Sequence, residues 1–389
     1  MSTPPHSPAI SDLLYSDVED DLRAAVRAVL ADRCGPAAVL GRIETAEPYD
    51  PALWRVLAVE LGLAGLLVPE ALGGQGASAR EAAVVMEELG GAVAPVPFLG
   101  SAVQATTALL GCDTADQATA ALLGRLAAGE ATAALAVPLS AAPGGGFPPG
   151  VRADAGGRLT GSVTSVADAL TADVLVVPAL GPGGPGLYEV AAAQAESARP
   201  VSFDLTRPLA DVTLDGAAGR LLATGDAAAA AVHSALLTGA GLLASEQLGV
   251  AQWCLDETVR YLGQRRQFGR VVGSFQALKH RLADLWLEVV SARAAARNAA
   301  GALACLASSP DAGAAAEAAL SVAVAQAYVS PVAVHAAEEA VQLHGGIGMT
   351  WEHPVHLYLK RAKADEIALG TPGRHRSALA VPVGLPPAG

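Results

Sequence analysis

The C-terminal part of this chain of 389 residues contains four long runs in which apolar residues recur at helical spacing. The runs cover approximately residues 226–264, 274–308, 312–343 and 354–369. Short segments containing glycine, proline or polar residues separate them, at 268–273, 308–311 and 344–348. Long helices joined by short connections pack as antiparallel neighbours. The pattern therefore predicts a C-terminal four-helix bundle over residues 221–376.

Residues 16–130 have the same helical character in shorter pieces. The expected helices cover 17–34, 51–61, 80–89, a segment ending near 110, and 116–126. Acidic residues fill the first turn of the first helix, where the helix dipole favours them. Residues 1–15 are rich in proline and serine and lack the basic and apolar regions of a signal peptide. We expect a disordered lead-in there and a tail over residues 377–389.

The composition changes over residues 131–220. The run SAAPGGGFPPG is typical of a loop, and short strand-like runs separated by turn residues follow it. The expected strands cover 158–166, 173–179, 186–191 and 209–214. This spacing predicts a small antiparallel β domain. The expected fold is therefore mainly α with a middle β domain: an N-terminal helical domain, the β domain and the bundle.

Charge and cysteine usage exclude several classes of function. The chain has 25 Lys and Arg against 38 Asp and Glu, a net charge of −13, which argues against general nucleic-acid binding. The four cysteines lie far apart and show no zinc-ligand spacing, so neither a disulfide framework nor a metal site is expected. The most apolar tract, 227–249, is interrupted by His233 and Glu246, which favours a buried helix over a membrane span. We expect a cytoplasmic protein.

One segment departs from this acidic composition. Four arginines lie within eleven residues, at Arg260, Arg265, Arg266 and Arg270, and a new helical run begins near Gln276. Arginine side chains and the N-terminus of a helix can together bind an anion. A solvated basic helix end is the commoner explanation when charge alone is considered.

The order of the motifs around this segment resembles the acyl-CoA dehydrogenase family of flavoproteins. The resemblance runs from about residue 17 to 376 and rests on LGLAGLLVPEALGGQGAS, VVMEELG, RRQFG, SFQ, LAD and QLHGGIGMT. It implies that FAD is bound across a dimer interface, by the RxxFG bend of one subunit and the Gln-x-x-Gly-Gly loop of another. It also implies that Arg265 contacts the pyrophosphate, with the further contacts Gln267, Phe268, Gln276, Gln342, His344, Gly345, Gly346 and Thr371. Taken alone, QLHGGIG is more typical of an ordinary helix C-cap.

The reaction implied by the resemblance is the α,β-dehydrogenation of an acyl thioester, in which a base removes a proton and the flavin takes a hydride. At the usual position of the base this chain has Leu369, which cannot accept a proton. A second family position for the base matches the region of Thr238 and Gly239, which we expect to contact substrate and which has no carboxylate. The nearest acids are Glu246 and Glu366. Glu246 is either a desolvated base or a polar residue at the rim of a bundle helix. Glu366 is more typical of a solvated acid.

The β domain departs from the family pattern as well. The Trp-x-Thr segment that lies beside the flavin ring in many members is matched by Ser165 and Ala167. The family's Thr-Glu-Pro strand is replaced by Val137-Pro138-Leu139. The pyrophosphate half of an FAD site therefore matches the family, whereas the ring and base halves do not.

Three hypotheses remain open from the sequence. The chain could be an FAD-dependent dehydrogenase with a relocated base, acting on a thioester of coenzyme A or acyl-carrier protein. It could be the base-deficient subunit of a heteromeric acyl-CoA dehydrogenase. It could also be a non-catalytic scaffold of the same fold. The implied partners are an electron-transfer flavoprotein or another acceptor, and a second copy or a related chain in a dimer or tetramer.

Overall fold

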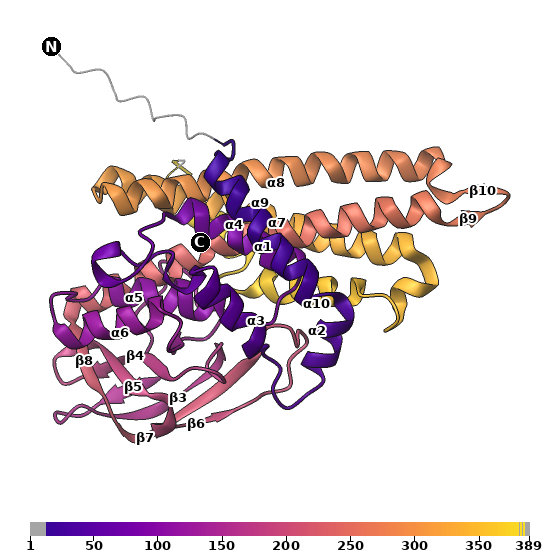
Figure 1. Cartoon of the computed structure of the whole chain (residues 1–389). Coiled ribbons are helices and arrows are strands. Elements are labelled where there is room, and N and C mark those ends of the chain that lie inside the picture. The colour runs from indigo at the N-terminus through magenta and orange to yellow at the C-terminus, as the bar shows by residue number, and fades with distance from the viewer. Residues whose placement is uncertain (1–12, 381, 383, 386–389) are drawn as a thin grey trace, which may run out of the picture.

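The computed structural model describes residues 13–380, 382, 384 and 385. An N-terminal set of helices, an eight-stranded sheet and a bundle of long helices follow one another along the chain (Figure 1). This confirms the fold class expected from the sequence. Most of the expected lead-in lies outside the described residues, and the last helix continues into the expected tail, to Ala380.

Four of the six described N-terminal α-helices begin at a side chain that caps them, whereas the second and the fifth do not. Ser16 and Glu19 form a capping box at the start of the first helix, and Ser78 and Glu81 form another at the fourth. The eight-residue second helix was not predicted. The α-helices are α1 (Asp17–Arg33), α2 (Pro36–Ile43), α3 (Pro51–Arg55), α4 (Ala79–Gly91), α5 (Thr106–Leu110) and α6 (Gln117–Ala127). Shorter helical turns are π-helical at Val56–Glu60 and Phe98–Ala105, and 3-10 at Leu63–Gly65 and Glu70–Leu72.

The middle sheet has the strand order β6-β7-β3-β2-β4-β5-β8, and β1 pairs with β4. Most pairs are antiparallel, as expected, but β1 and β2 both run parallel to β4. The strands that were not predicted, β1, β2, β6 and β8, have three to five residues, too few to show an alternating pattern. The strands are β1 (Ala133–Leu135), β2 (Val151–Ala153), β3 (Arg158–Ala167), β4 (Val174–Gly181), β5 (Gly184–Ala191), β6 (Ala195–Ala198), β7 (Leu209–Ala218) and β8 (Arg220–Thr224), with a 3-10 turn at Ala192–Gln194.

The first four bundle helices match the predicted runs to within a few residues, and the last was not predicted. The bundle helices are α7 (Gly225–Gln264), α8 (Gln276–Ser308), α9 (Ala312–His344), α10 (Val355–Ile367) and α11 (Pro372–Ala380). Between them lie β9 (Arg266–Gln267), β10 (Arg270–Val271) and 3-10 turns at Val272–Ser274 and Gly345–Met349. Among the described residues, two helical segments are long and apolar enough to cross a membrane, α7 and α9 with the 3-10 turn that follows it, but 67% and 61% of their most apolar windows are buried. Both are therefore core helices of the bundle in this structure.

Glycines allow α4 and α7 to approach until their backbones touch. A Cβ atom built on Gly249 would overlap the carbonyl oxygen of Glu87, and one on Gly90 would overlap that of Glu246, each at less than 3.0 Å. Both neighbours are backbone atoms, which cannot rotate away as a side chain can. This contact joins the N-terminal helices to the bundle without a layer of side chains between them.

Gly249→Ala is therefore expected to destabilise the protein by at least about 1–3 kcal/mol, the usual cost of overpacking a core. Gly263→Ala is the matched control, because Gly263 lies on the same helix and no described atom lies within 4 Å of a Cβ built on it. Alanine is the better helix former, so the control should gain roughly 0.5–1 kcal/mol. Urea unfolding midpoints would measure both changes. Equal midpoints for the two variants would contradict the close contact.

Candidate functional site

The basic bend of the sequence is a hairpin at one end of the bundle. β9 and β10 pair across Phe268 and Gly269, and Figure 1 shows the hairpin projecting away from the sheet. Phe268 has a φ of 52° and Gly269 one of 74°, so both turn residues are left-handed. Glycine adopts this conformation freely, but phenylalanine rarely does, and the Phe268 side chain is 88% exposed. Positive φ at both central residues is the geometry of a tight two-residue hairpin, and here it leaves the Phe268 ring exposed to solvent.

The Gly345-Gly346 loop lies at the same end of the same chain. The ring of Tyr261, in the last turn of α7, stacks on the ring of His344 at 4.4 Å between centroids and so ties the end of α7 to the end of α9. Gly345 has a φ of 64° and a ψ of −138°, a backbone conformation restricted almost entirely to glycine. No described atom lies within 4 Å of a Cβ built on either glycine. Both motifs therefore lie at the same end of the bundle in one chain, whereas the resemblance assigned their contributions to one FAD site to different subunits.

Most of the residues expected to contact the cofactor face outward at this end. The exposed ones are Arg265, Gln267, Phe268, Gln276, Gln342, Gly345 and Gly346. His344 is the exception. Its side chain is buried, its Nδ1 donates to the carbonyl of Ala340 at 2.6 Å, and burial lowers its pKa. Stacking and burial turn the His344 ring into the protein, so the expected contact of this residue with FAD would have to come from its backbone.

Leu369, at the expected position of the base, lies in a closed site. It is fully buried with a φ of 53°, and its N–H donates to the carbonyl of Leu139 at 2.7 Å. The N–H of Leu139 in turn donates to the carbonyl of Ser165 at 2.9 Å. The segments expected to lie beside a flavin ring thus bond to one another.

Side chains fill the space between helix α7 and the loop that contains Leu369. A Cβ built on Gly239 would lie 3.2 Å from Leu369 Cδ1 and 3.1 Å from Gln104 Cγ. Gly239 is buried and Thr238 is half-buried, whereas Thr371 is exposed. The position expected to contact an acyl group is therefore packed against the chain's own side chains.

Glu246 belongs to a buried cluster of charges. Its carboxylate pairs with Arg207 and, at 2.5 Å, with Arg361, which also donates to Asp204 at 2.8 Å. Burial by itself raises the pKa of Glu246, but the two guanidinium groups outweigh burial and hold it below its usual range. Burial and the Glu246 carboxylate raise the pKa of Asp365. A carboxylate already neutralised by two arginines is a poor proton acceptor, which argues against Glu246 as the base.

Glu366 lies at the surface of α10. Its carboxylate approaches Lys363 at 3.5 Å, and Lys363 also pairs with Glu338 at 3.3 Å. The side chain is one-third exposed, so it is a solvated acid rather than a dry base. This is the alternative that the sequence favoured for Glu366.

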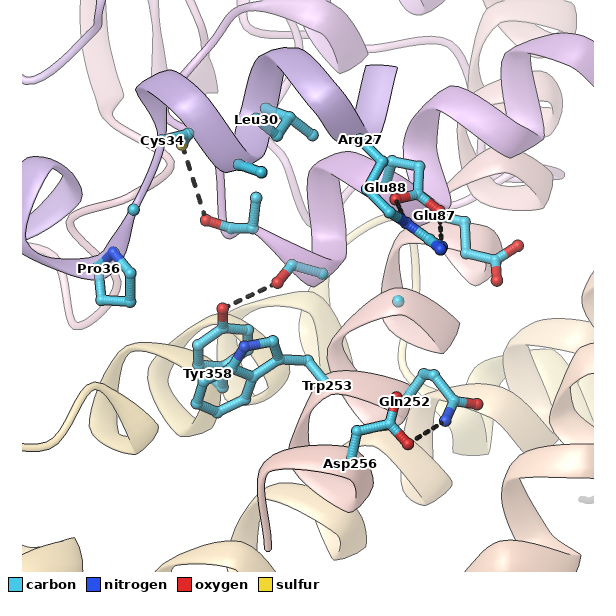
Figure 2. Close-up of a pocket in the computed structure, with 15 residues that line it drawn as sticks. Arg27, Leu30, Cys34, Pro36, Glu87, Glu88, Gln252, Trp253, Asp256 and Tyr358 are labelled. Carbon is cyan, nitrogen blue, oxygen red and sulfur yellow. Dashed lines mark hydrogen bonds and ion pairs between the residues drawn. The ribbon is translucent and has the colours of Figure 1, made fainter. Parts of the chain in front are cut away.

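A cavity of 480 Å³ lies between α1, α4, α7 and α10 (Figure 2). Its floor is the stacked pair Trp253 and Tyr358, whose ring centroids are 3.4 Å apart. The acids on its wall already have partners: Glu87 pairs with Arg23 and Arg293, and Glu88 with Arg23 and Arg27. Glu87 and Glu88 belong to the VVMEELG motif, whereas none of the residues expected to contact FAD lines the cavity. Asp256, which is also on the wall, accepts a hydrogen bond from Gln252 at 2.8 Å, so the acids of this cavity are paired within the protein.

Comparison with known proteins identifies the family. The family model described as the acyl-CoA dehydrogenase N-terminal domain matches residues 16–130, and the one for the C-terminal domain matches residues 229–382. Acyl-CoA dehydrogenase IpdE2 of Mycobacterium tuberculosis is 37% identical over 90% of this chain and 92% of its own. The chain belongs to the acyl-CoA dehydrogenase family. Its members are oxidoreductases that act on CH–CH groups.

Two solved structures of complexes resemble this family member over nearly its whole length. The ChsE4-ChsE5 complex from Mycobacterium tuberculosis superposes with a TM-score of 0.83 at 28% identity, covering 97% of this chain and 100% of that one. A single-residue variant of the Tcur3481-Tcur3483 steroid acyl-CoA dehydrogenase gives 0.81 at 29% identity, with 95% and 98% coverage. Both are assemblies of unlike chains by their names.

FAD is the cofactor expected from the family. The residues of this family member suit the pyrophosphate of FAD but do not suit its flavin ring. Arg265 and the open glycine loop suit a pyrophosphate, which needs positive charge and close backbone approach. The loop of Leu369 does not suit a flavin ring, because its backbone groups bond to Leu139 and the adjoining space is filled. The sequence places Leu139 in the segment expected beside the flavin ring, but it does not indicate Gln104, because no motif or periodicity connects Gln104 with Leu369.

Proposed function

We propose that this chain is the base-deficient subunit of a heteromeric acyl-CoA dehydrogenase. In this proposal it contributes the β9–β10 hairpin and the Gly345-Gly346 loop to an FAD site whose ring end and base belong to a related partner chain. The proposal rests on one observation. The loop of Leu369 is closed on Leu139, whereas the Gly345-Gly346 loop, which is expected to approach the pyrophosphate, is open.

The chemistry of the proposed assembly is divided between the chains. Bound FAD supplies the hydride acceptor for α,β-dehydrogenation of an acyl thioester. The Arg265 guanidinium offers two parallel N–H donors and a positive charge to the pyrophosphate, and the exposed ring of Phe268 covers the adenosine end. The partner's carboxylate removes the proton. We place the assembly in the cytoplasm and expect an electron-transfer flavoprotein to reoxidise it.

The relatives support an assembly of unlike chains and suggest its substrate class. Both solved complexes named above pair unlike chains, and one is described as a steroid acyl-CoA dehydrogenase. We therefore propose the coenzyme A thioester of a steroid-derived acid as the substrate. The alternative of a self-sufficient dehydrogenase has lost its main candidate base, because Glu246 is ion-paired within the protein.

The absorption spectrum of the purified chain tests the proposal. Produced alone, the chain should be colourless. Co-produced with a family member that has a carboxylate at the position matching Leu369, it should copurify as a yellow complex that oxidises an acyl thioester. Leu369→Glu in the lone chain should restore neither flavin nor activity, because the new carboxylate enters a closed site. A lone chain that holds one flavin and turns over a thioester would refute the proposal.

A further inference from the structure

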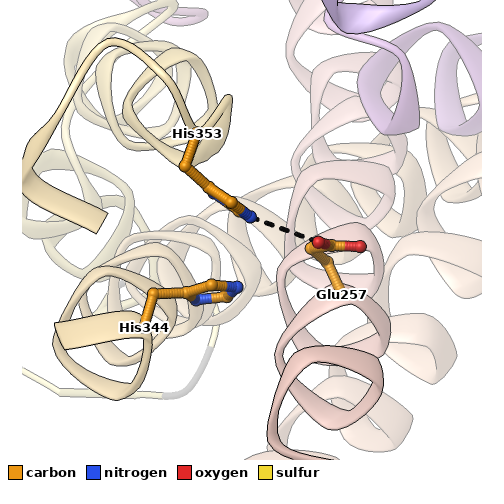
Figure 3. A group of neighbouring side chains, drawn as sticks. All are labelled: Glu257, His344 and His353. Carbon is orange, nitrogen blue, oxygen red and sulfur yellow. Dashed lines mark hydrogen bonds and ion pairs between the residues drawn. The ribbon is translucent and has the colours of Figure 1, made fainter. Parts of the chain in front are cut away.

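Two histidines and a glutamate meet beneath the Gly345-Gly346 loop. Glu257 lies on α7, His344 ends α9, and His353 precedes α10 (Figure 3). One potential ligand atom from each lies within 4.8 Å of the others, and His353 Nε2 already approaches Glu257 Oε1 at 3.2 Å. His344 is 3% exposed and His353 is 8% exposed. The cluster is thus a compact and largely dry set of nitrogen and oxygen donors.

His344 is oriented as a metal ligand. Its Nδ1–H donates to the carbonyl of Ala340, which leaves the lone pair on Nε2. That nitrogen is buried and has no hydrogen-bond partner among the described residues. A backbone carbonyl that fixes one ring nitrogen so that the other can coordinate a cation is the usual outer-shell arrangement of metal-binding histidines. An unpartnered buried acceptor is otherwise costly, and a cation would satisfy it.

We propose that Glu257, His344 and His353 form a binding site for a late first-row divalent cation, with Zn²⁺ as the best match. Two imidazoles and one carboxylate are a frequent zinc ligand set, and a water completes the tetrahedron. Ligand atoms about 2.0–2.2 Å from a tetrahedral Zn²⁺ lie roughly 3.5 Å apart. The glutamate and His353 atoms, at 3.2 Å, lie close to that spacing, and the His344 ligand atom lies within 4.8 Å of both.

Two contacts must change when the cation binds. The proton on His353 Nε2 has to move to Nδ1, which gives up a 3.3 Å hydrogen bond from the N–H of Val355. Arg260 also pairs with Glu257, but its side chain is 56% exposed and its charge is screened by solvent. These changes make the site weaker than a prebuilt one, although the cation would still link α7, α9 and the start of α10.

The site can be tested by equilibrium dialysis of Zn²⁺ against the full-length chain, without an affinity tag and after treatment with a chelator. The wild type should bind one equivalent, and Co²⁺ in its place should give the visible absorption of a tetrahedral site. His353→Gln should weaken Zn²⁺ binding at least tenfold. Zn²⁺ should raise the thermal midpoint of the wild type and leave that of His353→Gln unchanged.

His335→Gln is the matched control, because His335 pairs with Glu288 and Glu339 in an exposed histidine–carboxylate group on the same protein. It should bind Zn²⁺ like the wild type. If His353→Gln does not fold, Glu257→Gln replaces it, with the same expected loss. No Zn²⁺ binding by the wild type, or equal binding by the wild type and the cluster variant, would overturn the proposal.

Discussion

Replacing Arg265 with alanine in the assembled two-chain enzyme is expected to weaken FAD binding by roughly ten- to a hundredfold. The proposed contact is a charge-assisted hydrogen bond to a pyrophosphate, which contributes about 1.5–3 kcal/mol, and each 1.4 kcal/mol is a factor of ten in affinity. Arg265 is exposed and has no ion pair with any described carboxylate. Its loss should therefore leave the fold intact. Flavin retained after gel filtration, and a dissociation constant from fluorescence titration, would measure the effect.

Two further variants make this result specific. Arg265→Lys should lie between the wild type and the alanine variant, because lysine keeps the charge but loses the paired donors of the guanidinium group. Arg152→Ala removes an exposed arginine from β2, away from the hairpin, and should not change flavin content. If Arg265→Ala and Arg152→Ala retain flavin equally, Arg265 does not hold the cofactor.

Arg361→Met is expected to reduce the free energy of unfolding by about 3–5 kcal/mol. The change removes the guanidinium group that joins Asp204 of the middle domain to Glu246 of the bundle, both almost fully buried. Removing one member of a buried ion-pair cluster leaves carboxylates desolvated without compensation, and that penalty is larger than the net contribution of the intact pair. Methionine retains most of the volume, so the measurement isolates the charge.

Arg281→Met provides the comparison. Arg281 donates to Glu339 at 2.8 Å, but its side chain is 44% exposed, so the loss should be below about 1 kcal/mol. Unfolding midpoints in urea would measure both variants against the wild type. A similar loss in the two variants would show that the buried cluster is no more important to the fold than a surface ion pair.

Local patterns were sufficient to predict the long helices and the basic bend between α7 and α8, although not that the bend is a β-hairpin. The runs that became α7 to α10 show helical periodicity over many turns, and RRQFG and QLHGGIG are contiguous motifs that lie where helices end. The short strands β1, β2, β6 and β8 could not be predicted, because three to five residues are too few to show alternation, and the pairing partners of β1 and β8 are distant in sequence. The chain direction of β1 and β2 against β4 depends on those distant pairings as well.

The candidate sites depended more strongly on tertiary contacts. Glu246 appears in the sequence as an isolated acid among small residues, and only the fold brings Arg207 and Arg361 against it. The cluster of Glu257, His344 and His353 was equally hidden, because its first two members are 87 positions apart and the last two lack a recognised zinc-ligand spacing. Nothing in the sequence predicted a metal site, and the one proposed here depends on the fold alone.

The closed loop of Leu369 also affects how many flavins each assembly can hold. A dimer of identical copies would contain two open pyrophosphate sites and two closed flavin-ring sites, so neither FAD site would be complete. Pairing with an unlike chain that has an open ring position would complete one site per pair, so the enzyme would contain roughly half as many flavins as polypeptides. Production of either chain alone would then leave the cell without the activity.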